Sequence, residues 1–228
     1  MKVITIIQAR TSSSRLPNKV MLDLYGKCLL ERVIDKAKEI KKSDEVWVAT
    51  SVHENDDIIE YLCERMGIPV YRGSLLDVRW RYYHIAKQQN ADLIVRITAD
   101  NPFTEPVFAD ELIEALINHS GYDYARMDKS KILDGTHSEV FTMNALEKSI
   151  QEFDDDQNRE HVTPAMIFHM KKLEVIPSNN ELVPKTPYFI GVDTFEDFKR
   201  CVLIYKKFGT KKTLKHIIKE INTYGKAI

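Results

Sequence analysis

The chain has few cysteines and no long hydrophobic run, and each absence excludes a class of protein. Its 228 residues include three cysteines, which are Cys28, Cys63 and Cys201. Three distant cysteines form neither a disulfide framework nor a zinc cluster, so we expect buried, reduced thiols. The apolar run from Val3 to Ile7 is too short for a signal-peptide core or a membrane span. These absences predict a cytoplasmic protein with no membrane partner.

An excess of charge of either sign is also absent. Lys and Arg together number 33 and Asp and Glu number 34, which gives a formal net charge of −1. General nucleic-acid binders rely on many excess Lys and Arg, so we expect no nucleic-acid partner. Repeats, low-complexity tracts and obvious linkers are absent too. The sequence therefore predicts one domain over residues 1–228, with room for a local cationic pocket.

Apolar runs alternate with helical patterns through the first half of the chain. Unbroken apolar or β-branched runs predict strands at 3–7, 45–50, 69–71 and 92–98. Apolar residues at helical spacing predict helices at 28–41, 56–66, 78–89 and 107–118. This alternation with short connections is typical of βαβ units and a parallel sheet. In such sheets, ligands bind beyond the carboxyl ends of the strands.

The pattern loosens after residue 121. We expect further strands at 122–126, 138–142, 171–176 and 187–192. We expect a polar turn at 154–158 and helices at 143–153, 159–170, after Thr194 and at 212–224. The predicted fold is a single α/β domain with a mostly parallel, twisted sheet flanked by helices. A mixed α+β insertion is expected at about residues 121–190.

The most informative stretch is QARTSSSRLPNK, residues 8–19, which directly follows the first predicted strand. It carries Arg10, Arg15 and Lys19 with four hydroxyl side chains, and no acidic residue occurs before Asp23. Hydroxyls and backbone amides can cradle phosphate oxygens while Arg and Lys neutralise their charge. The loop has no glycine, so it matches neither the P-loop nor the dinucleotide fingerprint. It favours a polyphosphate ligand, with a solvated basic loop as the alternative.

Two acidic residues stand at the ends of predicted strands. Asp100 closes LIVRITAD and Asp193 closes YFIGVD. Two such acids in one sheet can share a hard cation such as Mg²⁺ and leave its other positions to water and phosphate oxygens. Each acid alone could equally be a turn residue or a helix N-cap. The basic loop supplies a reason for a metal, so Asp100 and Asp193 are the candidate metal ligands.

Two weaker groups complete the candidates. Residues 72–83 combine arginines with clustered aromatic residues, and Gly73 could let a base approach the backbone closely. Scattered histidines at 137, 161 and 169 are more often structural than ligands, and neither an H-x-x-x-H pair nor a Ser-His-Asp arrangement stands out.

Together these motifs resemble a known family. IIQARTSSSRLPNK resembles the opening A-R-x-x-S-x-R-L-P-x-K of the cytidylyltransferases that activate 3-deoxy-manno-octulosonate and the sialic acids. The chain most resembles the branch called spore coat polysaccharide biosynthesis protein F. That branch is also suggested by VATS (48–51), YRGSLLDV (71–78), RYY (81–83), VRITADNP (95–102), EVF (139–141), REHVTP (159–164) and VDTFED (192–197). The matches run in family order from residue 3 to about 208.

The resemblance implies a nucleotide-diphospho-sugar transferase-like, Rossmann-related fold, CTP as donor, Mg²⁺ as cofactor and a homodimer. By position, it assigns nucleotide binding to Gln8, Ala9, Arg10, Ser12, Ser13, Arg15, Lys19, Arg72, Gly73, Arg81 and Asp100. It assigns catalytic roles to Arg10, Lys19, Asp100 and Asp193, with the two aspartates as metal ligands. The insertion at about residues 121–190 is then expected to shape the acceptor pocket and a dimer contact, and Glu139, Arg159 and His161 fall where such a contact is expected.

The chain departs from the family at three places. Asn18 stands where the family usually has Gly, and Asn tolerates the positive φ that the turn requires. Residues 98–102 read TADNP where the octulosonate-activating relatives usually read QGDEP, so the amide of that motif is missing. Phe195 replaces a common Pro at a helix start.

The sequence thus predicts a cytidylyltransferase for surface polysaccharide or glycan biosynthesis that transfers CMP from CTP to an acceptor and releases pyrophosphate. A glycosyltransferase of the same fold and a non-catalytic nucleotide-binding protein are the alternatives. Residues 154–156 fit the D-x-D metal motif of glycosyltransferases but lie in a polar stretch that is typical of a solvated turn. The presence of both candidate metal ligands, Asp100 and Asp193, counts against a non-catalytic nucleotide-binding protein. A nonulosonic acid, an octulosonic acid, a sugar phosphate and a phosphonate all remain open as acceptor.

Overall fold

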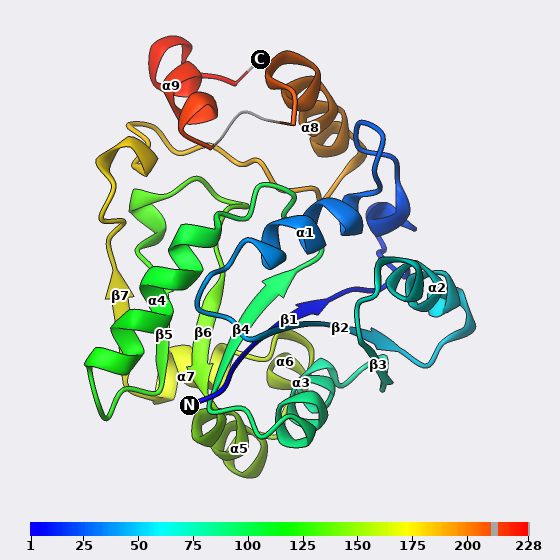
Figure 1. Ribbon diagram of the computed structural model, residues 1–228, viewed down its shortest axis with the longest axis vertical. Coiled ribbons are helices and arrows are strands. Elements are labelled where there is room, and N and C mark those ends of the chain that lie inside the picture. The colour runs from blue at the N-terminus through cyan, green and yellow to red at the C-terminus, as the bar shows by residue number, and fades with distance from the viewer. Residues whose placement is uncertain (211–213, 228) are drawn as a thin grey trace.

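The computed structural model, which describes residues 1–210 and 214–227, contains a seven-stranded sheet between two layers of helices (Figure 1). The strand order is β3-β2-β1-β4-β6-β5-β7. Strands β1 to β4 are mutually parallel, β5 and β7 pair in parallel, and β6 runs antiparallel to both of its neighbours. The strands are β1 Val3–Gln8, β2 Glu45–Ser51, β3 Val70–Gly73, β4 Leu93–Thr98, β5 Tyr124–Met127, β6 Glu139–Thr142 and β7 Lys172–Val175.

The helices divide between the two faces of the sheet. Their bounds are α1 Leu29–Lys38, α2 Asp57–Met66, α3 Val78–Gln88, α4 Pro106–Asn118, α5 Met143–Glu152, α6 Asp156–His161, α7 Pro164–His169, α8 Phe195–Phe208 and α9 Leu214–Tyr224. Side chains of α1, α2, α4, α8 and α9 join one buried apolar cluster, and those of α3, α5 and α7 join the other. The predicted mostly parallel α/β sheet is confirmed.

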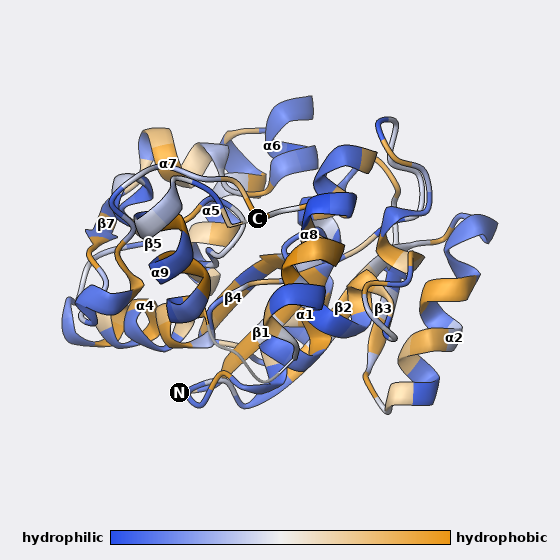
Figure 2. Cartoon of the chain, turned by 90° about the horizontal axis from the view of Figure 1, so that it is seen from above, coloured by the Kyte–Doolittle hydropathy of each residue, from blue (hydrophilic) through white to orange (hydrophobic). Residues whose placement is uncertain are grey.

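Strand β1 shows why the centre of the sheet is mostly apolar on both faces. Val3 and Ile7 belong to one apolar cluster, whereas Ile4 and Ile6 belong to the other. Successive side chains of a strand point to opposite faces, so a strand covered on both faces needs an unbroken apolar run. Figure 2 shows the hydrophobic central strands enclosed by helices that are hydrophilic on much of their surface.

The predicted strand at 187–192 is wrong. This segment forms one isolated bridge, between Asp134 and Phe189, and adds no strand to the sheet. Its backbone amides instead bond to loops: Ile190 N donates to the Asp134 carbonyl (2.8 Å) and Val192 N to the Asp100 carbonyl (2.9 Å). Ile190 and Val192 are buried in the apolar core, which explains the apolar run without strand pairing.

The predicted helix at 159–170 is also wrong, because it breaks into α6 and α7. At Val162, between them, φ is +69° and ψ is −51°, and Thr163 N donates to the His161 carbonyl (2.8 Å). This is a three-residue γ-turn, which a helix cannot contain. Helix α6 already begins at Asp156, so three of the five residues of the predicted polar turn at 154–158 are helical.

Strands β5, β6 and β7, from the expected insertion at 121–190, continue the same sheet rather than forming a separate one. The start of the predicted helix at 212–224 lies partly outside the described residues; helix α9 begins at Leu214. No described helix is both long and apolar enough to cross a membrane.

Candidate functional site

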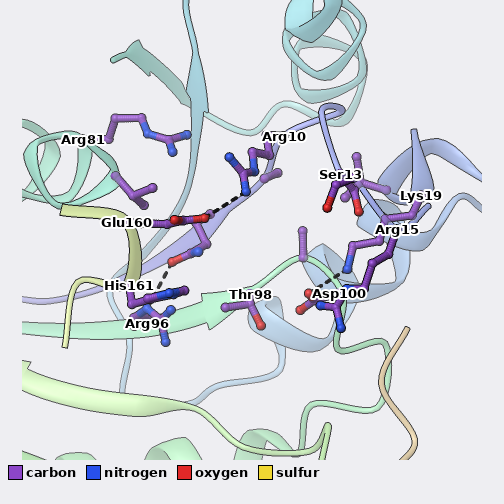
Figure 3. Close-up of a pocket in the computed structure, with 16 residues that line it drawn as sticks. Arg10, Ser13, Arg15, Lys19, Arg81, Arg96, Thr98, Asp100, Glu160 and His161 are labelled. Carbon is purple, nitrogen blue, oxygen red and sulfur yellow. Dashed lines mark hydrogen bonds and ion pairs between the residues drawn. The ribbon is translucent and has the colours of Figure 1, made fainter. Parts of the chain in front are cut away.

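A cavity of about 350 Å³ lies at the carboxyl ends of β1 and β4 (Figure 3). This volume is typical of a small-molecule site. Among the residues expected to bind nucleotide, those that line it are Gln8, Ala9, Arg10, Ser13, Arg15, Lys19, Arg81 and Asp100. Ser12, Arg72 and Gly73 are not in its lining, and of the expected acceptor residues His161 lines it while Glu139 and Arg159 do not.

The loop after β1 is held in shape by Asp56, a buried carboxylate that sequence reasoning missed. Asp56 Oδ1 accepts hydrogen bonds from Thr11 N (2.8 Å) and Thr11 Oγ1 (2.6 Å). The Thr11 carbonyl in turn accepts from Ser13 N (2.9 Å) and Asn18 N (2.8 Å), which closes the loop. Asn18 has a φ of +58°, the conformation expected at this departure from the family. A buried carboxylate and an asparagine at positive φ thus hold this glycine-free loop in shape.

Burial acts to raise the pKa of Asp56, but hydrogen bonds from Ser51 and Thr11 outweigh it and hold the pKa below the ordinary value of 3.8. Asp56 is therefore a buried carboxylate at neutral pH, and the loop depends on its charge. The sequence gives only a weak signal for this role of Asp56, because an acidic residue at the start of a helix is usually an exposed cap.

Lys19 bonds to both expected metal ligands. Its Nζ donates to Asp100 Oδ2 (2.9 Å), Asp193 Oδ1 (3.3 Å) and the Val192 carbonyl (2.7 Å). Asp193 Oδ1 also pairs with Arg15 Nη2 (2.8 Å). The 190–193 segment thus brings Asp193 to the sheet edge through loop contacts rather than strand pairing. Asp100 and Asp193, which are expected to act together with Lys19, therefore meet at its ammonium group.

Burial acts to raise the pKa of Asp100, but the positive charge of Lys19 and a hydrogen bond with Thr98 hold it below the ordinary value. Asp100 is consequently ionised at neutral pH. Both aspartates direct carboxylate oxygens at the Lys19 ammonium. The same two oxygens suit a divalent metal ion that takes its other ligands from water and phosphate. Within the described residues no group of three or more His, Cys, Asp or Glu could hold a metal. Residues 1–210 and 214–227 therefore offer at most a two-carboxylate site.

The nucleoside candidates differ in their surroundings. Arg81 is buried and lines the cavity; burial lowers its pKa to about 10, and its Nη1 donates to the Ala49 carbonyl (3.1 Å). A Cβ on Gly73 would lie 2.8 Å from Arg81 Cγ, so glycine makes room for that side chain. Arg72 bonds to Glu60 (2.6 Å) and to the Ser51 carbonyl (2.9 Å), on the α2 side of the sheet.

Helix α6 closes another side of the cavity with residues that sequence reasoning missed or placed elsewhere. Glu160, from α6, pairs with Arg10 Nη2 (3.1 Å), and His161 lines the cavity, as Arg96 of β4 does (Figure 3). Glu160 and Arg96 were both missed. Arg159 pairs instead with Asp154 (2.6 Å) and Asp156 (3.4 Å).

The D-x-D stretch is engaged in structural contacts. Asp154 accepts from Arg79 (3.1 Å) and from Arg159, Asp155 accepts from Asn158 N (2.9 Å) at the start of α6, and Asp156 pairs with Arg159. None of the three aspartates lines the cavity. These bonds explain the three acids without a metal.

A sequence model described as cytidylyltransferase matches residues 4–224 of the chain. The chain belongs to the cytidylyltransferase family. It is 39% identical over 209 residues to an uncharacterized protein of Methanocaldococcus jannaschii, covering 91% of this chain and 85% of that protein. It is 32% identical over 220 residues to the spore coat polysaccharide biosynthesis protein SpsF of Bacillus subtilis, covering 92% and 88%.

Solved cytidylyltransferase structures share the fold. A cytidylyltransferase of Leptospira borgpetersenii superposes with a TM-score of 0.90 at 27% identity, over 100% of this chain and 97% of that one. A CMP:2-keto-3-deoxy-manno-octonic acid synthetase, solved in complex with CTP, gives a TM-score of 0.70 at 17% identity, over 91% and 99%. The predicted family and the single-domain α/β fold are confirmed.

Proposed function

We propose that this cytidylyltransferase moves CMP from CTP to a sugar acid or a related acceptor and releases pyrophosphate, as a step in surface polysaccharide or glycan biosynthesis. The observation that carries the proposal is the contact of Lys19 with both Asp100 and Asp193 beside a hydroxyl-rich basic loop. The names of two relatives support it: one structural neighbour was solved with CTP, and SpsF is a polysaccharide biosynthesis protein.

In this proposal the loop after β1 binds the triphosphate. Arg15, Ser13 and the backbone amides hold the β- and γ-phosphates, while Arg10 and Lys19 offset the charge that develops at the α-phosphorus. An acceptor hydroxyl gives its proton to solvent water, and its oxygen forms a bond to the α-phosphorus of CTP. The bond between that phosphorus and the oxygen that bridges to the β-phosphate breaks, and pyrophosphate leaves with the bridging oxygen. Most of the rate comes from alignment and fixed charge, because in-line transfer demands little covalent chemistry of the protein.

Asp100 and Asp193 are the residues that would hold Mg²⁺. The bound ion would lower the pKa of the acceptor hydroxyl and offset charge on the α-phosphate. Metal dependence in this fold is supported by a Mycobacterium tuberculosis structure solved with manganese, which superposes with a TM-score of 0.61 at 13% identity. Lys19 holds the two carboxylates together, and a phosphate can then take over its ammonium.

The remaining expected residues take supporting roles in this proposal. Arg81 contacts the nucleoside, Gly73 admits the Arg81 side chain, and Arg72 anchors the adjoining end of β3. His161 lines the acceptor side of the cavity, while Arg159 braces α6. From the family likeness we also propose a homodimer in the cytoplasm with contacts in residues 121–190, and light scattering of the purified protein tests the dimer.

Pyrophosphate release tests the reaction directly. Each of the four common ribonucleoside triphosphates is incubated with Mg²⁺, the protein and one acceptor from a panel of 2-keto sugar acids, sugar phosphates and phosphonates. We expect release with CTP and one acceptor class. Binding of CTP without release across the panel would instead identify a nucleotide-binding protein, and a preference for a finished nucleotide sugar would identify a glycosyltransferase.

A further inference from the structure

The three cations of the loop after β1 are all paired with carboxylates from distant segments of the chain. The nitrogen–oxygen pairs are Arg10–Glu160 (3.1 Å), Arg15–Asp193 (2.8 Å), Lys19–Asp100 (2.9 Å) and Lys19–Asp193 (3.3 Å). The groups proposed to bind the triphosphate are therefore already neutralised by the protein itself. A triphosphate that binds to this loop has to displace carboxylates, and each displaced carboxylate loses its counter-charge.

The Lys19 ammonium makes the most complete set of these contacts. A lysine ammonium has three N–H donors. The three acceptors around Lys19 are Asp100 Oδ2, Asp193 Oδ1 and the Val192 carbonyl (2.7 Å). The Lys19 side chain is only 10% exposed, so water has little access to it. A phosphate oxygen can bind to this ammonium only if it replaces one of the three acceptors.

The same carboxylate oxygens cannot serve Lys19 and a divalent metal ion at once. Both oxygens lie within 3.3 Å of the ammonium nitrogen. Mg²⁺ takes oxygen ligands at about 2.0–2.1 Å, so an ion held by this pair would compete with the ammonium for the same space. Two cations that close repel each other strongly in a partly buried site. In this arrangement Lys19 therefore stands in the place of the metal ion.

Release of Lys19 leaves two neighbouring carboxylates in need of a cation. The Asp100 and Asp193 side chains are each 31% exposed, so water screens their mutual repulsion only in part. A triphosphate that draws Lys19 away favours entry of a metal ion, and a metal ion that enters frees Lys19 for a phosphate. Two ligands that favour release of the same contact bind with positive coupling, which by linkage is equal in both directions.

We propose that Lys19 is an internal counter-ion that occupies the metal site, so that the divalent metal ion binds together with the triphosphate and only weakly before it. The inference rests on the proposed function and concerns the order in which that site takes its ligands. Lys19 then has two successive partners, first the two carboxylates and afterwards a phosphate. Metal ions alone leave the site closed, and the triphosphate opens it.

Metal titration in the absence of nucleotide tests the proposal. A triphosphate coordinates metal ions itself, so its presence would hide the contribution of Lys19. Mn²⁺, a hard cation that prefers oxygen ligands, is titrated into the full chain, and its free concentration is followed by electron paramagnetic resonance. Lys19→Met removes the ammonium and keeps a long, unbranched side chain. We expect Lys19→Met to bind Mn²⁺ about 5- to 150-fold more tightly than the unmodified protein, the usual range for a coupling between two ligands.

Arg10→Met is the matched control for that variant. It removes one positive charge from the same loop, but the carboxylate it releases belongs to Glu160, which is not a candidate metal ligand. We expect the Mn²⁺ affinity of Arg10→Met to equal that of the unmodified protein. An equal gain in both variants is explained by net charge alone and overturns the proposal, as does the lack of a gain in Lys19→Met.

The gain should also depend on the two carboxylates. In Lys19→Met with Asp193→Asn one of them is neutral, so we expect the Mn²⁺ affinity to return to that of the unmodified protein or below it. A gain that persists in this double variant places the metal ion elsewhere and overturns the proposal.

A measurement on the unmodified protein keeps the proposal testable if Lys19→Met does not fold. Lysine acylation by acetic anhydride is followed by mass spectrometry, with and without saturating Mn²⁺. We expect Mn²⁺ to raise the acylation rate of Lys19, because the ion expels the ammonium from between the carboxylates. Lys87, which pairs with Glu147 outside the cavity, is the internal control and should not change. Equal rates for Lys19 with and without Mn²⁺ overturn the proposal.

This proposal and the proposed function fail in different ways. The titration and the labelling involve neither nucleotide nor turnover. Lack of pyrophosphate release from every triphosphate would remove cytidylyl transfer and leave the metal result standing. Unchanged Mn²⁺ affinity in Lys19→Met would remove the competition between Lys19 and the metal ion, and pyrophosphate release with CTP would still be expected.

Discussion

The cavity has a loop end, at Lys19 and Asp100, and a strand end, at Arg96 of β4, and the two ends hold their charges in different ways. At the loop end, Arg15 and Lys19 pair with carboxylates from distant turns; Lys19 is itself buried, but the two carboxylates are each 31% exposed and the Arg15 side chain is 62% exposed. At the strand end, Arg96 pairs with Glu139 on the next strand, and both side chains are nearly buried. Partly exposed ion pairs can exchange partners when a polyanion arrives, whereas a buried pair keeps its geometry. The first arrangement suits a triphosphate that enters and leaves, and the second suits fixed recognition.

The largest effect is expected where the loop end meets the chemistry. Asp100→Asn removes one of the two carboxylates beside Lys19 while keeping the shape of the side chain. Loss of a preorganised charge at a reaction centre costs about 3 kcal/mol, so we expect kcat to fall about a hundredfold. Steady-state pyrophosphate release at saturating CTP and acceptor measures it.

Asp92→Asn is the matched control for that variant. Asp92 precedes β4 at the opposite end of the strand, outside the cavity lining, where its carboxylate accepts from Lys2 N (2.6 Å). We expect its turnover to equal that of the unmodified protein. Near-full turnover in Asp100→Asn, or an equal loss in both variants, would remove Asp100 from the reaction centre.

A substitution of Asp56, the carboxylate that holds the loop after β1, should affect binding at the loop end but not at the strand end. Asp56→Ala leaves the buried Thr11 amide and hydroxyl without their acceptor, which costs about 2–3 kcal/mol of unfolding free energy. Because the loop loosens, the KM for CTP should rise while the affinity for a sugar-acid acceptor changes little. Urea unfolding and calorimetry measure the two effects. An equal loss of both affinities would show that the two ends are one unit.

The Asp56 carboxylate also makes the free energy of unfolding depend on pH. Its pKa is lower in the folded protein than the ordinary value of 3.8, so the unfolded chain binds more protons as the pH falls below 3.8. The stabilisation from its charge is therefore complete above that pH and is lost as the pH falls from 3.8 towards the folded-state pKa. We expect the stability gap between the unmodified protein and Asp56→Asn to narrow below pH 3.8 in urea unfolding. A gap that is constant or widens contradicts an ionised anchor.

The two ends also differ in how far the sequence predicts them. The loop end is readable because three cations and four hydroxyls lie within residues 10–19, directly after an apolar strand. Arg96 has no such signal: it interrupts the apolar run LIVRIT, and its partner Glu139 lies 43 residues away. Only the pairing of β4 with β6 joins them, and that register depends on a topology which local patterns do not specify.

The same reasoning separates the elements that were predicted correctly from those that were not. The helices and strands of the first half follow strong periodic patterns, and α1 to α4 and β1 to β4 all formed where expected. The segment 187–192 is as apolar as a strand, but a buried loop against Asp100 and Asp134 needs the same apolar residues. The break at Val162 has no signal, since a β-branched residue is the one least expected at positive φ.

Val162 offers the smallest but most specific test of the strand end. Its γ-turn separates His161, which lines the cavity, from Thr163, which bonds to Glu139. At a φ of +69° an L side chain is disfavoured and glycine is not, so the strain has to be held by the surrounding contacts.

We expect Val162→Gly to be more stable to urea than Val162→Ala by about 1 kcal/mol, because both lose the buried isopropyl group and only glycine adopts this φ freely. Val140, equally buried in β6, is the control: there glycine should be less stable than alanine by about 0.5–1 kcal/mol. The same order at both positions would show that the turn is unstrained. If glycine is the more stable variant at position 162 and the less stable one at position 140, strain is stored at Val162. That strain lies next to Thr163, which bonds to Glu139 at the strand end of the cavity.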